Sequence, residues 1–192
     1  MSGFSAALTA AGAKEARKAL RGLFGRKMSA EDWRLVGRYD EEPRGDGWYM
    51  VRIDPDDPLR LEHLPTGQKL VVPFAEILTD YASVPKMLQG LADGSEVLHL
   101  KATDHKDEAV FHDMLYAAAG CYAVKKHRAV WVRVTKAQAD AVLYVCMKCR
   151  GATLADGLAY HGAVSLCGGP AWKKCRRENA EWPKLLVPAE ET

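Results

Sequence analysis

Imidazole, carboxylate and phenol side chains gather in three stretches of this sequence. Residues 79–85 read TDYASVP, residues 109–116 read AVFHDMLY, and residues 137–140 read AQAD. The second stretch contains a His-Asp pair, and an imidazole nitrogen with carboxylate oxygens is a ligand set that suits a divalent metal ion. One interpretation is therefore a metal-dependent hydrolytic site. Its candidate residues are Asp80, His112, Asp113 and Asp140.

The same side chains also suit a purely structural role. His112 and Tyr116 lie four residues apart, which places them on one face of a helix. Asp140 precedes the apolar stretch 141–147, so its helix is expected to be buried and its carboxylate to need a partner. We predict a polar network that closes on itself in a dry interior, whereas an enzyme requires a cleft that reaches these groups. The predicted network comprises Asp80, Ser83, His112, Asp113, Tyr116 and Asp140.

Cysteines offer a second candidate metal site. Cys146, Cys149, Cys167 and Cys175 follow the spacing C-x2-C-x17-C-x7-C, in which the tight pair of a zinc ribbon occurs once instead of twice. The first pair also falls inside a predicted helix, where knuckle geometry is not available. We expect buried thiols, with a zinc site or a bridge within or between subunits as alternatives, and no cofactor.

The first half of the chain carries the pattern of a small sheet. Short apolar runs at 48–53 and 68–72 are separated by turn-forming residues at 54–58 and 65–67. They predict an antiparallel sheet over about 33–75.

The second half is helical. A helix is predicted from Lys106 to Ala119, ended by Gly120, and a strand over 129–134. Thr135 and Gln138 have the spacing of a capping box, which predicts a helix that ends near residue 151. A last helix is predicted over 154–166. The fold class is therefore α+β: a small antiparallel sheet followed by a helical half, with a basic amphipathic helix at the N-terminus.

The ends of the chain are more basic than its middle. The 192 residues carry 27 Lys and Arg against 25 Asp and Glu, a net charge of +2, which excludes the strong positive field of a dedicated nucleic-acid binder. We divide the chain into a basic arm at 1–28, one α+β domain at 29–171 and a basic, tryptophan-containing tail at 172–192. Candidate partner contacts at these ends are Arg17, Lys18, Arg21, Trp172, Lys173, Lys174, Arg176 and Arg177.

The composition of the chain limits the class of protein to which it can belong. With 48% hydrophobic and 27% charged residues, the sequence is that of a globular domain and not of a disordered chain or a coiled coil. No run of 18 apolar residues predicts a membrane span. The first 13 residues are uncharged and basic residues follow them, the reverse of a secretory signal, so no export signal is expected.

The motifs TDYASVP and HDMLY, the AD-containing helix, YHGAV at 160–164 and GPAW at 169–172 occur in an order that resembles the domain of unknown function 1353 family of phages, prophages and bacteria. The resemblance spans roughly residues 70–173. It implies a role in the virion or its morphogenesis and assigns no catalytic residue.

On this basis we expect a structural component of a phage or prophage virion. A tail, baseplate or neck connector is expected, bound to other virion subunits in a symmetric multi-copy assembly that forms in the host bacterial cytoplasm. The alternatives are a metal-dependent hydrolase, such as one directed at peptidoglycan, and an assembly factor that never enters the particle.

Overall fold

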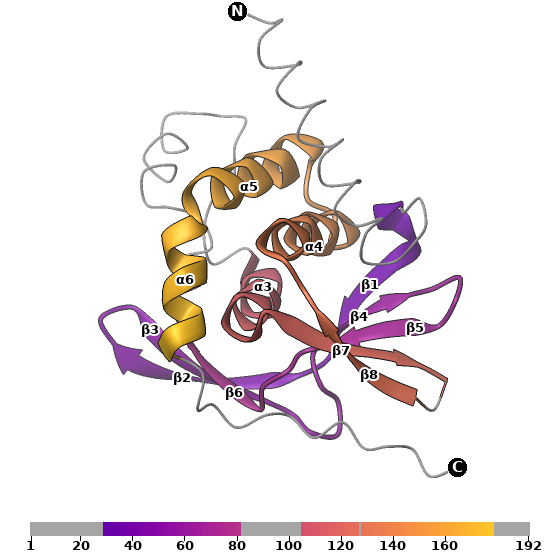
Figure 1. Ribbon diagram of the computed structural model, residues 1–192, viewed down its shortest axis with the longest axis horizontal. Helices are drawn as coiled ribbons and strands as arrows, with labels where there is room; N and C mark the ends of the chain where they lie inside the picture. The colour runs from indigo at the N-terminus through magenta and orange to yellow at the C-terminus, as the bar shows by residue number, and fades with distance from the viewer. Residues whose placement is uncertain (1–28, 82–104, 127, 179–192) are drawn as a thin grey trace, which may run out of the picture.

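The structure is a computed structural model that describes residues 29–81, 105–126 and 128–178. Two antiparallel sheets and the helices α3 to α6 make up these residues, with α3 lying between the other helices and the sheets (Figure 1). The α+β class predicted from the sequence is confirmed. The predicted N-terminal helix and arm at 1–28 lie outside the described residues.

The larger sheet has five strands in the order β1-β4-β5-β7-β8, and every neighbouring pair is antiparallel. Leu35, Leu61 and Leu70 stand opposite one another on adjacent strands and are buried, because alternate residues of a strand face the core. The strands are β1 (Trp33–Val36), β4 (Arg60–His63), β5 (Gln68–Val71), β7 (Gly120–Lys125) and β8 (Arg128–Arg133).

The smaller sheet has three strands in the order β2-β3-β6, which are β2 (Tyr39–Gly45), β3 (Trp48–Ile53) and β6 (Glu76–Thr79). Asp46 and Gly47 join β2 to β3, and both have positive φ, as a tight hairpin turn requires. The single sheet predicted over 33–75 is thus divided between two sheets.

The helices begin where local capping allows. They are α3 (Lys106–Ala118), α4 (Lys136–Cys149), α5 (Leu154–Cys167) and α6 (Gly169–Glu178). The predicted capping box opens α4: the Gln138 N–H donates to Thr135 Oγ1 at 3.3 Å, and the Thr135 N–H donates to Gln138 Oε1 at 2.9 Å. Ala119 ends α3 in the left-handed conformation, and β7 follows at once at Gly120.

Helix α3 occupies the centre of the molecule. It contacts α4, α6, β6 and β7, and its side chains Phe111, Met114 and Leu115 are fully buried. Polar side chains on α3 are therefore enclosed on several sides, and this enclosure determines what His112 and Tyr116 can do.

Candidate functional site

His112 and Tyr116 of α3 meet Asp140 of α4 in the interior. The exposed fractions of the three residues are 2%, 3% and 1%. The Tyr116 hydroxyl donates to Asp140 Oδ1 at 2.5 Å, and His112 Nε2 lies 3.5 Å from the same oxygen. The two rings of α3 also contact each other, with centroids 4.1 Å apart. The sequence interpretation placed these three residues together, and the structure brings them together.

Lys136 and Ser165 complete this cluster from two further positions. The Lys136 ammonium donates to Asp140 Oδ2 at 2.8 Å and to the Val164 carbonyl at 2.6 Å, and Ser165 Oγ donates to Asp140 Oδ2 at 3.3 Å. Since Val164 and Ser165 lie in α5, the cluster joins α3, α4 and α5. We call His112, Tyr116, Lys136, Asp140 and Ser165 the buried polar network, after its three buried members on α3 and α4; Lys136 is half-buried and Ser165 is exposed, so the network reaches the surface at α5.

Hydrogen bonds within the network shift the pKa values of two buried groups, His112 and Asp140. Burial opposes charge on His112, but its hydrogen bonds with Asp113 and Asp140 outweigh burial and raise the pKa of the imidazole. Burial likewise opposes charge on Asp140, yet hydrogen bonds from His112, Lys136 and Tyr116 lower the pKa of that carboxyl. The network therefore favours the imidazolium form of His112 and the carboxylate form of Asp140.

Asp113 connects the network to the smaller sheet. His112 Nδ1 lies 3.6 Å from Asp113 Oδ1, and the Thr79 hydroxyl donates to Asp113 Oδ2 at 2.6 Å. The Tyr81 N–H in turn donates to Thr79 Oγ1 at 2.9 Å. Thr79, the first residue of the TDYASVP stretch, thus binds Asp113.

Asp80 is placed differently from the sequence expectation. It was expected inside the polar network, but the structure exposes it, because alternate residues around β6 face opposite sides and the buried position belongs to Thr79. Ser83, the other expected member from this stretch, lies outside the described residues.

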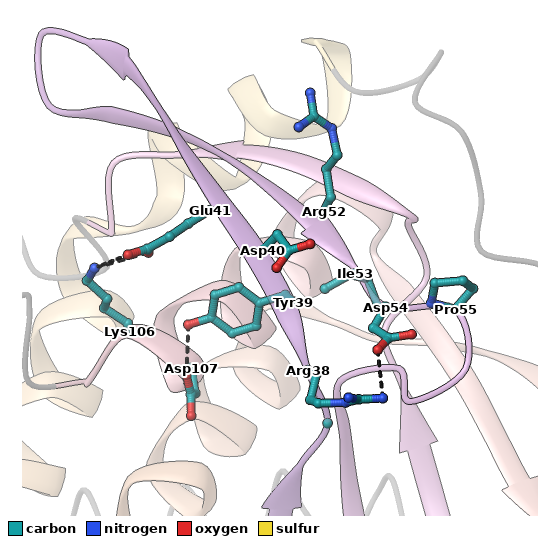
Figure 2. Close-up of a pocket in the computed structure, with 11 residues that line it drawn as sticks. Arg38, Tyr39, Asp40, Glu41, Arg52, Ile53, Asp54, Pro55, Lys106 and Asp107 are labelled. Atoms are coloured by element: carbon teal, nitrogen blue, oxygen red, sulfur yellow. Dashed lines mark hydrogen bonds and ion pairs between the residues drawn. The ribbon is translucent and has the colours of Figure 1, made fainter.

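A surface pocket of about 870 Å³ lies elsewhere, between the smaller sheet and the start of α3. It is lined by residues 37–41, 52–55 and 106–107, so none of the buried polar network reaches it. Figure 2 shows Lys106 and Asp107 approaching Glu41 and Tyr39 from the helix. The sequence interpretation missed this pocket.

Polar side chains of β2 and α3 bond one another at the pocket. The Tyr39 hydroxyl donates to Asp107 Oδ1 at 2.7 Å, and Lys106 Nζ lies 2.7 Å from Glu41 Oε1 (Figure 2). Tyr81 donates a further hydrogen bond to Glu41. Burial and the acceptor Asp107 raise the pKa of Tyr39, whereas the bonds from Lys106 and Tyr81 lower the pKa of Glu41. These bonds fasten the start of α3 to the smaller sheet.

Four of the five cysteines have described side chains, and these four are free thiols. Cys121 and Cys146 are buried, Cys149 is half-buried and Cys167 is exposed, while the side chain of Cys175 lies outside the description. Burial raises the pKa of Cys121 to about 12. In the described parts of the chain, no group of three or more His, Cys, Asp or Glu side chains is arranged to hold a metal ion.

Trp172, at the start of the expected basic tail, belongs to α6. Its ring stands edge-on to Tyr116 with centroids 5.0 Å apart, so Trp172 packs α6 against the buried polar network. Lys173 and Lys174 on the same helix are exposed. The side chains of Arg176 and Arg177, and the whole of Arg17, Lys18 and Arg21, lie outside the description. None of the helices at described positions is long and apolar enough to span a membrane.

Fold and network together define a small α+β protein in which histidine, tyrosine and aspartate side chains hold three helices to one another. The chain belongs to the DUF1353 family, whose model, described as a protein of unknown function, matches residues 56–164. The match confirms the resemblance carried by the TDYASVP and HDMLY motifs, with limits that begin earlier and end earlier than expected. No curated protein and no solved structure matches the chain.

Proposed function

We propose that this protein is a structural component of a phage or prophage virion and acts through protein contacts as a tail, baseplate or neck connector. It assembles with other virion subunits in several symmetric copies in the cytoplasm of the host bacterium. The phage and prophage occurrence implied by the family resemblance supports the setting. The chemistry of the buried polar network supports a structural role.

One observation carries this proposal. Two of the four candidate catalytic side chains, His112 and Asp140, are enclosed, and Asp140 receives donors from Tyr116, Lys136 and Ser165. A satisfied buried network of this kind rigidifies a fold and specifies a single packing. The pocket of Figure 2 is lined by other residues, so substrate entering it would not reach His112.

The network also explains how a small domain can hold a contact surface in place. Lys136 fixes the end of α5 through the Val164 carbonyl, and Trp172 of α6 packs on Tyr116. Lys173 and Lys174 are thereby presented on a helix with a defined position. We assign the partner contacts to the basic ends of the chain on this ground.

Quantitative mass spectrometry of purified particles tests the proposal. We expect the chain in washed virions at a fixed multi-copy ratio to the major tail subunit. The double variant Lys173→Glu, Lys174→Glu is expected to lower incorporation without lowering the melting temperature, while the control Arg44→Glu, on β2, keeps incorporation unchanged. A chain abundant in the lysate and missing from particles would instead identify an assembly factor.

Metal analysis of the purified full chain tests the hydrolase alternative. Stoichiometric zinc or another transition metal that is lost in His112→Ala would replace the structural proposal with a metal-dependent enzyme. A loss of thermal stability in that variant, without a change in metal content, is the result that we expect.

A further inference from the structure

Among the residues that the structure describes, strand β8 forms an open edge of the larger sheet. It pairs with β7 through six consecutive residue pairs without a register shift, and it is the last strand in the order of the described sheet (Figure 1). One side of an edge strand presents unpaired backbone N–H and C=O groups, which can pair with a further strand. A strand of six regular residues is long enough to support such an addition.

The other described sheet edges carry protection that β8 lacks. Strand β1 has four residues and is contacted by α4, and β6 has four residues and is contacted by α3. Strand β2 contains Pro43, a register shift between Pro43 and Gly45, and the charged Asp40, Glu41 and Glu42. Short length, proline, irregularity and covering helices are the usual defences against strand addition. Within the described parts of the chain, strand β8 has a charged residue at each end and none of these other defences.

An apolar row of the larger sheet runs out to this edge. Leu61, Leu70, Ala123 and Val130 are opposite one another on consecutive strands, from the buried centre to β8. Val130 is 55% exposed, and Trp131, on the other face of the strand, is 38% exposed. An added strand with an apolar residue opposite Val130 would continue the row and cover this surface.

Charge indicates the chemistry of the added strand. The hairpin 120–133 contains Lys125, Lys126, Arg128 and Arg133 and no Asp or Glu. These four side chains are exposed: Arg128 and Arg133 are the two ends of β8, Lys126 lies in the turn before it, and Lys125 ends β7 opposite Arg128. We propose that β8 is a docking edge for an extended apolar segment of another protein, flanked at both ends by acidic residues, which adds to the larger sheet as a further strand. This inference deepens the proposed virion function, on which it rests, by assigning it a partner surface.

A second copy of this chain fits the edge less well. Pairing β8 with the β8 of a second copy would bring together two hairpins that each carry four exposed Lys or Arg side chains and no Asp or Glu, and like charges close to each other destabilise a strand pair. Nucleic acid also fits less well, because the Trp131 ring is engaged edge-on with Tyr122 at 5.2 Å. A base-stacking platform requires a free aromatic face.

The test uses the full chain and a synthetic peptide of about ten residues, the length of a typical strand with its flanks. The peptide alternates valine and threonine and carries two glutamates at each end. One control peptide has lysines in place of the glutamates. A second control keeps the glutamates but has methyl groups on alternate backbone nitrogens, which removes the donors of one edge. Hydrogen exchange measures protection of the β8 amides, and calorimetry measures affinity.

We expect the glutamate peptide to protect residues 128–133, to bind at least about tenfold more tightly than the lysine peptide, and to lose binding on methylation. The double variant Arg128→Glu, Arg133→Glu changes exposed residues, so it should fold with an unchanged melting temperature and reverse the preference between the two charged peptides. This reversal separates a docking defect from a folding defect.

Four results would overturn the docking edge. They are equal binding of the methylated peptide, absence of protection at β8, a dimer of the free chain whose formation is abolished by the arginine variant, and stronger protection of β8 by a single-stranded oligonucleotide than by the peptide. A chain found in virions whose β8 fails these tests refutes this inference alone, whereas β8 binding in a chain missing from virions refutes the virion proposal alone.

Discussion

Replacing Asp140 with asparagine tests the buried polar network at its centre. The substitution keeps the shape of the side chain but removes the charge that accepts Tyr116 at 2.5 Å and Lys136 at 2.8 Å, beside His112. Breaking a buried ion pair by removing one partner costs about 3–5 kcal/mol. Lys136 keeps the Val164 carbonyl as an acceptor and its side chain is 22% exposed, so we place the cost at the lower end. The expected loss in the free energy of unfolding is about 3 kcal/mol.

Urea denaturation and thermal melting of the full chain measure this loss. For a chain of this size a loss of about 3 kcal/mol corresponds to a melting temperature lowered by about 6–12 °C. The matched control is Asp46→Asn, the same chemical change at an exposed hairpin turn, which should stay within about 0.5 kcal/mol of wild type. If Asp140→Asn were as stable as this control, the carboxylate would not hold the network and the reasoning would be refuted.

Three further perturbations have defined outcomes. The folded state raises the pKa of His112 above its ordinary 6.5. The contribution of His112 to stability is therefore complete below about pH 6.5 and is lost as the pH rises through the folded pKa. Denaturation at several pH values should show this decline in wild type and a weaker decline in His112→Gln. Gly120→Ala should cost about 1–3 kcal/mol by the same assay, since its Cβ would lie 2.3 Å from the Trp131 ring, and a cost near zero would show that the ring moves freely. Thr135→Ala removes the cap that Gln138 completes and should cost about 1 kcal/mol, a prediction that an unchanged urea midpoint would contradict.

Local signals were sufficient for several elements. Thr135 and Gln138 determine the start of α4 by bonds within four residues, and the apolar run 48–53 lies between turn residues, so both elements follow from adjacent sequence. Strand β7 was missed because Gly120 was interpreted only as the end of a helix, whereas it begins a strand directly. Helix α6 was missed because the last helix was predicted to end at residue 166, before Gly169 and Pro170, although proline is compatible with a first helical turn.

The candidate site was predictable to the extent that its contacts follow helical periodicity. His112 and Tyr116 share a helix face at a spacing of four residues. Lys136 lies four residues before Asp140, and this spacing also indicates that the lysine is a partner of the aspartate. Asp80 was predicted in the interior, where the structure has the neighbouring Thr79, because strand parity alone decides which of two neighbouring residues faces inward. The pocket was not predictable, since Glu41 and Lys106 meet only through the tertiary fold.

The central claim is that Tyr116 and Asp140 stabilise each other inside a closed interior and thereby brace the helices. A double-mutant cycle with Tyr116→Phe and Asp140→Asn, measured by urea denaturation, tests it most directly. The account predicts that the two losses are coupled by about 1 kcal/mol, because the hydroxyl donates to the charged carboxylate at 2.5 Å. Strictly additive losses would contradict it.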